Sequence, residues 1–304
     1  MNGKAQIAVV VLTTAVTIVA AFRIAGNHPE RGALKPGREI VDMASRKVRI
    51  PVQPQRILSL CTSATDTIVR IGAGERLAAI DEYSCIVPGA KDAVIIGKGS
   101  AISREQVIAL GIDLAFIWWY QDDAADLLER LSVSAVRIRS GRMTEVPAMI
   151  RLVGKCLNRS QTAENLAEEV AGYIRSATSR PVFSRTRVYL ELYGPLKTVG
   201  GNSYINDLIE LAGGRNIAGD ASSSVLLSAE RLIESDPDVI LFVEGFATVA
   251  SITRRSGMGK LTAVESGHIH PIDRYWLVAG AGIPAAEANL RKVLADNSNF
   301  VQER

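Results

Sequence analysis

Aromatic residues in this chain gather where predicted strands end, the edge at which open α/β sheets bind ligands. Only 16 of the 304 residues are Phe, Trp or Tyr, yet Trp118, Trp119 and Tyr120 are consecutive and close an apolar run. Aromatic rings at such positions can stack on a flat ligand, although they also pack cores and anchor loops. We predict that six strand-end aromatic residues contact a ligand: Tyr83, Trp118, Trp119, Tyr193, Tyr275 and Trp276.

Two glutamates occupy matching positions in a short internal repeat. The segments SREQVIALGIDLAFIW (103–118) and SAERLIESDPDVILFV (228–243) share a serine, a glutamate two residues later, an apolar helix face, an aspartate and a buried strand. The glutamates are Glu105 and Glu230, each at the second position of a predicted helix. A carboxylate there interacts favourably with the helix dipole, by ~0.3–1 kcal/mol, and this alone would explain both residues.

The three cysteines match neither a Cys-x-x-Cys zinc pattern nor a disulfide-rich scaffold. Cys61 follows the first strand of the predicted folded body, and Cys85 follows Tyr83. Both thiols could therefore reach the mouth of a ligand cleft in that half. Three interpretations of the pair stay open: a disulfide, soft ligands to a metal or haem, and two inert small residues. Cys156 is expected to be buried.

Motifs for catalysis and for nucleic-acid binding are missing from the sequence. There is no Gly-x-Ser-x-Gly or His-Glu-x-x-His motif, and three histidines leave few options for a hydrolytic triad or a zinc site. The glycine-rich segments at 72–74, 97–99 and 257–262 each lack a glycine that nucleotide-binding loops need. The net charge of +3 is spread along the chain without basic blocks. We predict no enzyme activity, no intrinsic cofactor and no nucleic-acid partner.

The start of the chain predicts where the protein works. Residues 5–22 (AQIAVVVLTTAVTIVAAF) carry no charge, follow Lys4 and precede Arg23 and a polar stretch. Such a run is an export signal or a membrane anchor, since it almost spans a bilayer core of ~30 Å. We assign residues 1–26 to one of these two and predict the periplasm or the outer face of the cytoplasmic membrane. The first cysteine is Cys61, so lipid attachment at this end is not expected.

Strand and helix patterns alternate in two parts of the chain, which predicts an α/β fold. A linker with a short hairpin covers 27–53, and an N-terminal α/β lobe with strands at 56–60, 77–81, 93–97, 113–119 and 135–139 covers 54–142. A helical section at 143–180 contains a longer helix, for which Ser160 is a candidate cap. A C-terminal α/β lobe covers 185–298. The prediction is two α/β lobes with mainly parallel central sheets, bridged by one long helix.

Four separated segments resemble, in the same order, the Fe/B12-type periplasmic binding proteins of ABC importers. They are RILSLCTSATDTIVRIGAGERLAAIDEYS, SREQVIALGIDLAFIWW, TVGGNSYINDLIELAGGRNIAGD and LSAERLIESDPDVIL, and the resemblance covers residues 38–295. It implies a ligand cleft between the two lobes and capture of a metal chelate: a ferric siderophore, haem or cobalamin. The iron or cobalt would belong to the transported ligand, which a monomeric receptor delivers to a membrane permease and its ATPase.

The resemblance also implies roles for single residues. Family members present one acidic residue per lobe to arginines of the permease dimer, and the matching positions are Glu105 and Glu230. The cobalamin binder of the family has aromatic residues that match Tyr83, Trp118 and Trp276, which implies a large flat macrocycle. A siderophore with acidic groups would instead recruit arginines, the candidates being Arg137, Arg139, Arg142 and Arg274.

Two functional classes stay open on the sequence. The first is a receptor for an ABC importer. The alternative is a membrane-anchored ligand sensor or scaffold that uses the same fold to present a ligand to a signalling partner. Charge reversal at both glutamates would separate them, since only an importer needs that contact for uptake.

Overall fold

The computed structural model describes residues 37–180, 186–222 and 224–298. The chain divides into two compact units, residues 1–37 and 38–304, and the fold below is that of the second. The predicted signal or anchor at residues 1–26 lies outside the described residues. Among the residues that are described, none of the helices is both long and apolar enough to cross a bilayer.

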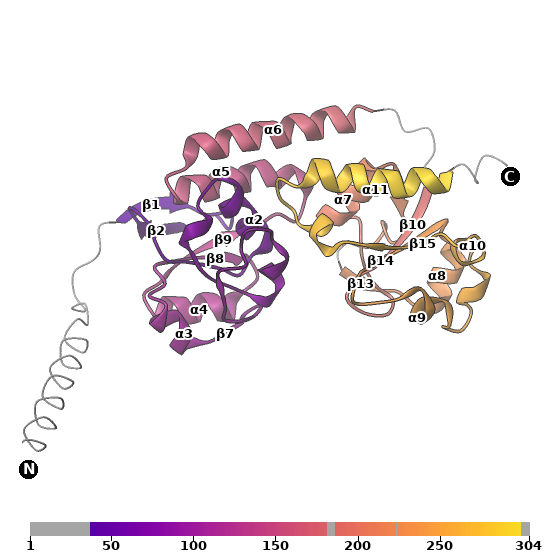
Figure 1. Cartoon of the computed structure of the whole chain (residues 1–304), viewed down its shortest axis with the longest axis horizontal. Coiled ribbons are helices and arrows are strands. Elements are labelled where there is room, and N and C mark those ends of the chain that lie inside the picture. The colour runs from indigo at the N-terminus through magenta and orange to yellow at the C-terminus, as the bar shows by residue number, and fades with distance from the viewer. Residues whose placement is uncertain (1–36, 181–185, 223, 299–304) are drawn as a thin grey trace, which may run out of the picture. The chain divides into compact units, whose positions relative to one another are not determined.

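The first lobe is built on a five-stranded parallel sheet with strand order β5-β4-β3-β8-β9. Figure 1 labels β8 and β9 of this sheet. The strands are β3 (Ile57–Ser59), β4 (Leu77–Ile80), β5 (Val94–Ile95), β8 (Leu114–Trp118) and β9 (Ser134–Ile138). They are connected through α2 (Thr62–Arg70), η1 (Gly74–Arg76), η2 (Glu82–Ile86), α3 (Arg104–Ala109) and α4 (Asp122–Arg130). Two small two-stranded sheets flank them: β1 (Gly37–Val41) with β2 (Lys47–Pro51), and β6 (Gly97–Lys98) with β7 (Ala101–Ile102).

The prediction of a buried strand at 93–97 is wrong. Only Val94 and Ile95 form a strand there, and both side chains are exposed. The reason is position in the sheet: β5 is an edge strand that pairs with β4 alone, and its apolar side chains are not covered. Ile96, one residue further, is the apolar residue of this run that enters the core.

The helical section consists of η3 (Met143–Glu145), α5 (Val146–Cys156) and α6 (Ser160–Thr178). The prediction that Ser160 caps the second helix is wrong, because Ser160 is its first residue and Arg159 holds the cap position. Helices α5 and α6 pack closely: a Cβ built on Gly154 would lie 2.0 Å from the Cβ of Ala163, so only glycine fits. Tyr173 on α6 donates a hydrogen bond to Glu287 Oε2 (2.5 Å) on α11, which ties the bridging helix to the second lobe.

The second lobe repeats the parallel arrangement with strand order β12-β10-β14-β15. The strands are β10 (Thr186–Glu191), β12 (Gly214–Asn216), β14 (Val239–Val243) and β15 (Ile269–Ile272), with an antiparallel pair β11 (Lys197–Val199) and β13 (Ser224–Leu226) beside them. The helices are α7 (Tyr204–Leu211), α8 (Ala229–Ser235), α9 (Val249–Thr253), η4 (Met258–Lys260), α10 (Thr262–Glu265), η5 (Arg274–Leu277) and α11 (Ile283–Ser298).

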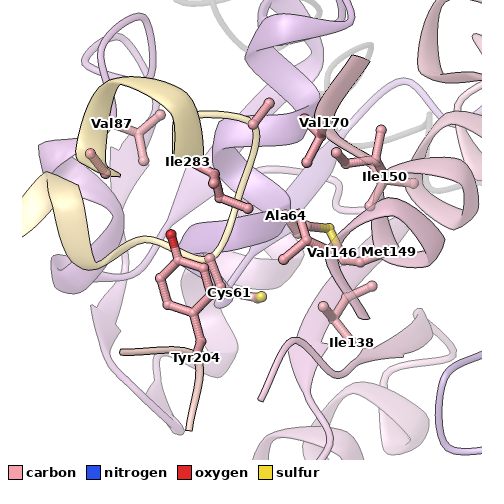
Figure 2. Packing of buried hydrophobic residues seen from close by; sticks show 14 of the residues in the cluster. Cys61, Ala64, Val87, Ile138, Val146, Met149, Ile150, Val170, Tyr204 and Ile283 are labelled. Carbon is pink, nitrogen blue, oxygen red and sulfur yellow. The ribbon is translucent and has the colours of Figure 1, made fainter. Parts of the chain in front are cut away.

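One large hydrophobic cluster runs through both lobes. Figure 2 shows part of it, where Ala64 on α2 and Met149 on α5 lie near Tyr204 on α7 and Ile283 on α11. Two smaller clusters lie within single lobes, around Ile117 in the first and Tyr189 in the second. The predicted α/β class with two parallel sheets is confirmed.

Candidate ligand-binding site

Three consecutive aromatic residues, Trp118, Trp119 and Tyr120, lie at the end of strand β8. The rings of Trp118 and Tyr120 are nearly parallel with centroids 6.2 Å apart, and Trp119 meets Tyr120 edge-on at 4.8 Å. The side chain of buried Gln121 accepts a hydrogen bond from Trp118 N (2.9 Å), which turns the chain at the strand end. Trp119 is 40% exposed and Tyr120 is 59% exposed. Two of these three rings are therefore available to a ligand.

Tyr83 lies between two cations. It belongs to η2, whose first turn is capped by the buried carboxylate of Asp81. The Lys98 ammonium is 5.5 Å from the centroid of the Tyr83 ring, and the guanidinium carbon of Arg274 is 5.9 Å from it. Arg274 also donates a hydrogen bond to Tyr83 O (2.5 Å). An arginine of the second lobe thus reaches an exposed aromatic residue of the first.

The second lobe contributes its own exposed pair. The rings of Tyr193, after β10, and Phe246, after β14, lie with centroids 4.9 Å apart at 67°. Phe246 also lines a cavity of about 520 Å³ at the end of β14, together with Glu244, Thr248 and Pro271. Phe246 was not among the predicted site residues, although it follows β14 by three residues, as Tyr83 follows β4.

Tyrosine hydroxyls from the two lobes influence one another. Protein atoms crowd the Tyr120 hydroxyl and raise its pKa, and the nearby Asp81, Tyr83 and Tyr193 raise it further. The pKa of Tyr193 is raised in the same way by burial, partly offset by Arg274. Arg274 also lies against the ring of Tyr83, and we group these residues as one candidate site. Tyr120 was omitted from the predicted set.

Tyr275 and Trp276 are placed differently from the exposed rings. Both lie in η5 and pack, half-buried, against the large hydrophobic cluster. The Tyr275 hydroxyl donates to Asp66 Oδ1 (2.5 Å) and accepts from Arg70 Nη2 (3.1 Å). The hydroxyl of Tyr275 is therefore engaged in a contact between the lobes.

The cysteines are free thiols, so the disulfide interpretation of Cys61 and Cys85 is wrong. Cys61 is fully buried as the residue before α2, and its burial raises the thiol pKa well above the usual range. It does not reach the mouth of a cleft. Cys85 is exposed, and its Sγ donates to Glu82 O (2.9 Å). Burial raises the pKa of Cys156 to about 12. Within the described ranges, no three His, Cys, Asp or Glu side chains gather as they would around a metal ion.

The candidate arginines are mostly committed to carboxylates. Arg137 pairs with Asp122 (2.5 Å), Arg139 with Glu145 (3.1 Å) and Arg142 with Asp207 (2.6 Å). Arg274 instead donates to the backbone carbonyl of Tyr83 and lies against the aromatic ring of the same residue. Arg139 also lies over the ring of Trp119, with its guanidinium carbon 6.0 Å from the centroid. Of the four, Arg274 is the one with no carboxylate partner among the ion pairs of the described residues.

Glu105 and Glu230 both lie exposed in the first turn of a helix. Ser103 caps α3 and donates to Glu105 Oε2 (3.3 Å), while Ser228 caps α8. The backbone N–H of Glu230 and the Ser228 hydroxyl hold the pKa of the Glu230 carboxyl below its usual value. Both side chains are thus available to a partner.

Comparison with known proteins bears on this architecture. The family described as periplasmic binding protein matches residues 57–275. A cobalamin-binding protein of Halobacterium salinarum is 27% identical over 253 residues, which make up 75% of this chain and 68% of that protein. The apo form of a periplasmic heme-binding protein from Roseiflexus sp. RS-1 has a TM-score of 0.74 at 23% identity, over 80% of this chain and 99% of that one. A periplasmic vitamin B12-binding protein of Vibrio cholerae has a TM-score of 0.68 at 20% identity, over 81% and 98%. The two solved structures share the two-lobed fold.

Proposed function

Because this chain belongs to the periplasmic binding protein family, we propose that it is the solute receptor of an ABC importer and that its ligand is a flat metal-containing macrocycle of the cobalamin or haem class. Relatives named for cobalamin and solved structures named for heme support this class. The metal would arrive with the ligand, since the chain itself needs only to bind and release it. Catalysis has no part in this role.

The observation that carries the proposal is the exposure of five aromatic rings that follow strands of the two parallel sheets. Tyr83, Trp119 and Tyr120 come from the first lobe, and Tyr193 and Phe246 come from the second. Exposed rings of this size are unfavourable in water and are enriched where proteins bind flat or apolar partners. Their hydroxyls and edges can also bond to polar groups at the rim of a macrocycle. Trp118, Tyr275 and Trp276 are partly buried and pack against the large hydrophobic cluster.

Positive charge at the site gives a second criterion for the ligand. Arg274 and Lys98 both lie against the ring of Tyr83. A carboxylate on the ligand would form a charge-assisted hydrogen bond with either side chain. Haem carries carboxylates at its rim, whereas the rim of cobalamin carries neutral amides. The arrangement therefore accepts either ligand and favours the acidic one.

Delivery of the ligand requires a membrane partner. We place the contacts with the permease at Glu105 and Glu230, whose carboxylates are exposed. The apolar run at residues 5–22 would export the chain to the periplasm or anchor it to the outer face of the cytoplasmic membrane. A monomer suffices for this role, because each lobe supplies one docking residue.

Fluorescence titration tests the ligand. The full chain, stabilised in an amphipathic polymer, is titrated with cyanocobalamin, haemin and a ferric siderophore while tryptophan emission is recorded. All three tryptophans lie at or beside the proposed site, so one of the two macrocycles should quench with saturation at micromolar concentration or below. Free N-acetyltryptophanamide corrects for light absorption by the ligand. Saturation by the siderophore alone, or by none of the three, would reject the macrocycle class.

Alanine substitutions then locate the binding. Trp119→Ala and Tyr193→Ala, one from each lobe, should each weaken binding by about tenfold or more, since a lost aromatic contact is worth ~1–2 kcal/mol. Leu226→Ala removes an exposed apolar side chain outside the site and is the control. Equal affinities for all variants would show that the ligand binds elsewhere on the protein.

A further inference from the structure

The helices that carry Glu105 and Glu230 are held in the same way in the two lobes. The Ser103 hydroxyl oxygen accepts a hydrogen bond from Gln106 N (3.2 Å), and the Ser228 hydroxyl oxygen accepts one from Arg231 N (3.1 Å). Helix α3 leads into β8 and α8 leads into β14, and each of these strands pairs in parallel with the first strand of its sheet. The two helices thus hold equivalent places in their lobes.

The equivalence extends to single hydrogen bonds. The Asp113 carboxylate accepts from Arg56 N (3.1 Å), and the Asp238 carboxylate accepts from Arg187 N (2.7 Å). In each lobe the side chain of that arginine also donates to a carbonyl at the C-terminal end of the helix. The helix and strand of each repeat are therefore locked in one orientation, and equivalent positions present equivalent side chains.

One pair of equivalent positions is occupied by exposed isoleucines. Ile108 is 57% exposed and Ile233 is 38% exposed, while their neighbours Val107 and Leu232 are buried and anchor the helices. Each isoleucine follows its glutamate by three residues, so acid and isoleucine share one face of the helix. A single exposed isoleucine is ordinary on a protein surface. Ile233 also packs over Gly257, where an added Cβ would lie 2.6 Å from its Cδ1, yet it keeps part of its surface exposed. Two partly exposed isoleucines at equivalent positions, each beside an exposed acid, are a feature that the two lobes share.

We propose that Glu105 with Ile108, and Glu230 with Ile233, form two equivalent docking elements, each with an acidic and an apolar contact. This inference rests on the proposed importer function and extends it from the charges to the apolar contact. The partner that binds these two elements is the permease dimer, with one basic side chain beside an apolar recess on each subunit. Charge complementarity requires the basic group, and a partner with two copies of one surface matches the repeat in this chain.

Measuring the affinity of variants for the permease distinguishes the contribution of the apolar contact from that of the acidic contact. The permease–ATPase complex that imports the ligand in the source cell is held in lipid nanodiscs, and the affinity of the full chain for it is measured. Ile108→Ala with Ile233→Ala should weaken binding by about tenfold, and each single substitution by about threefold, because the variant side chain no longer buries its methyl and methylene groups against the partner. Val41→Ala with Leu226→Ala changes two exposed apolar side chains elsewhere and should leave affinity within twofold.

The acidic variants distinguish the two ways in which the experiment can fail. Glu105→Gln with Glu230→Gln should weaken binding at least as much as the isoleucine pair. Loss with the glutamine pair but not with the alanine pair overturns the apolar contact and leaves the docking face in place. Loss with neither pair overturns the proposed docking itself. A loss confined to one isoleucine overturns the equivalence. Ligand titration by fluorescence checks that every variant is folded, since all four side chains are exposed.

Discussion

The phenolic hydroxyl of Tyr275 donates a hydrogen bond to the carboxylate of Asp66 over 2.5 Å, although 209 residues separate them. Asp66 lies on α2 in the first lobe and is almost fully buried, while Tyr275 follows the last strand of the second lobe. Arg70 and the backbone N–H of Ala281 complete the partners of the carboxylate. One buried acid thus joins elements from both lobes close to the proposed ligand.

We expect Asp66→Ala to lower the free energy of unfolding by about 2–3 kcal/mol. The substitution leaves Arg70 and the Tyr275 hydroxyl without their acceptor. Breaking a fully buried pair costs ~3–5 kcal/mol, and the loss is smaller here because Arg70 is 37% exposed and water can replace the carboxylate. Tyr275→Phe keeps the ring and removes one hydrogen bond, so it should cost about 1 kcal/mol. Urea unfolding measures both, and equal stabilities of the two variants would contradict the expectation.

Gly280→Ala should destabilise the fold by about 1–3 kcal/mol, the usual cost of overpacking. A Cβ at this position would lie 2.5 Å from Asp66 Oδ2. Gly259→Ala is the matched control, because no atom lies within 4 Å of the added methyl group. On an Asp66→Ala background the cost of Gly280→Ala should shrink, since the clashing carboxylate is gone. An undiminished cost in the double variant would show that the strain arises elsewhere.

Acid sensitivity of the second lobe should depend on Glu191. Burial pulls the pKa of Glu191 upward, but hydrogen bonds from Arg255, Leu196 and Tyr189 outweigh it, and the net pKa lies below its usual value. A lowered pKa stabilises the folded state above the unfolded value of about 4.3, and this contribution is lost as pH falls through the folded pKa.

Glu191→Gln should therefore be less stable than the unchanged chain by about 2–3 kcal/mol at pH 7. The difference should stay constant down to about pH 5 and shrink at lower pH. Urea unfolding at several pH values checks this, with exposed Glu129→Gln as the control that leaves stability unchanged. A difference that is independent of pH down to pH 3 would show that packing, and not charge, is what Glu191 supplies.

Arg274→Gln should discriminate between the two macrocycles. If the guanidinium binds a carboxylate of the ligand, affinity for haemin should fall by about tenfold, the value of one charge-assisted hydrogen bond. Affinity for cyanocobalamin should change by less than about threefold, because its rim amides are neutral. Arg254→Gln, on the exposed surface of the second lobe, controls for the loss of one positive charge. Equal losses of affinity for both ligands would show that Arg274 only holds Tyr83 in place and does not bind a carboxylate of the ligand.

Thiol labelling should find one reactive cysteine in the folded protein. Cys85 is exposed, whereas Cys61 and Cys156 are buried with raised thiol pKa values. Thiolate is the reacting form, so a maleimide at pH 7 should label Cys85 within minutes and the other two only after denaturation. Mass spectrometry of the intact chain counts the labels. If no label were found before reduction, Cys85 would be in a disulfide, contrary to the structure.

The proposed site was partly accessible from the sequence. Strand ends at Trp118 and Tyr193 were predictable, because a buried strand is a continuous apolar run and its end follows from where that run stops. The exposure of Tyr120 and Phe246 was not, because it depends on what other segments leave uncovered. The same holds for Cys61, whose position after a strand suggested access although α2 and its neighbours bury it.

The sequence by itself determined the features that depend on a few neighbouring residues: the caps at Ser103 and Ser228, the buried strands β8 and β14, and the order of motifs that marks the family. Tertiary structure decided what depends on segments far apart in the chain. It set Asp66 against Tyr275, brought Arg274 to Tyr83, and left Ile108 and Ile233 uncovered at equivalent positions. The physical reason is that backbone capping and strand burial are satisfied locally, whereas exposure and long-range hydrogen bonds exist only once both lobes have packed.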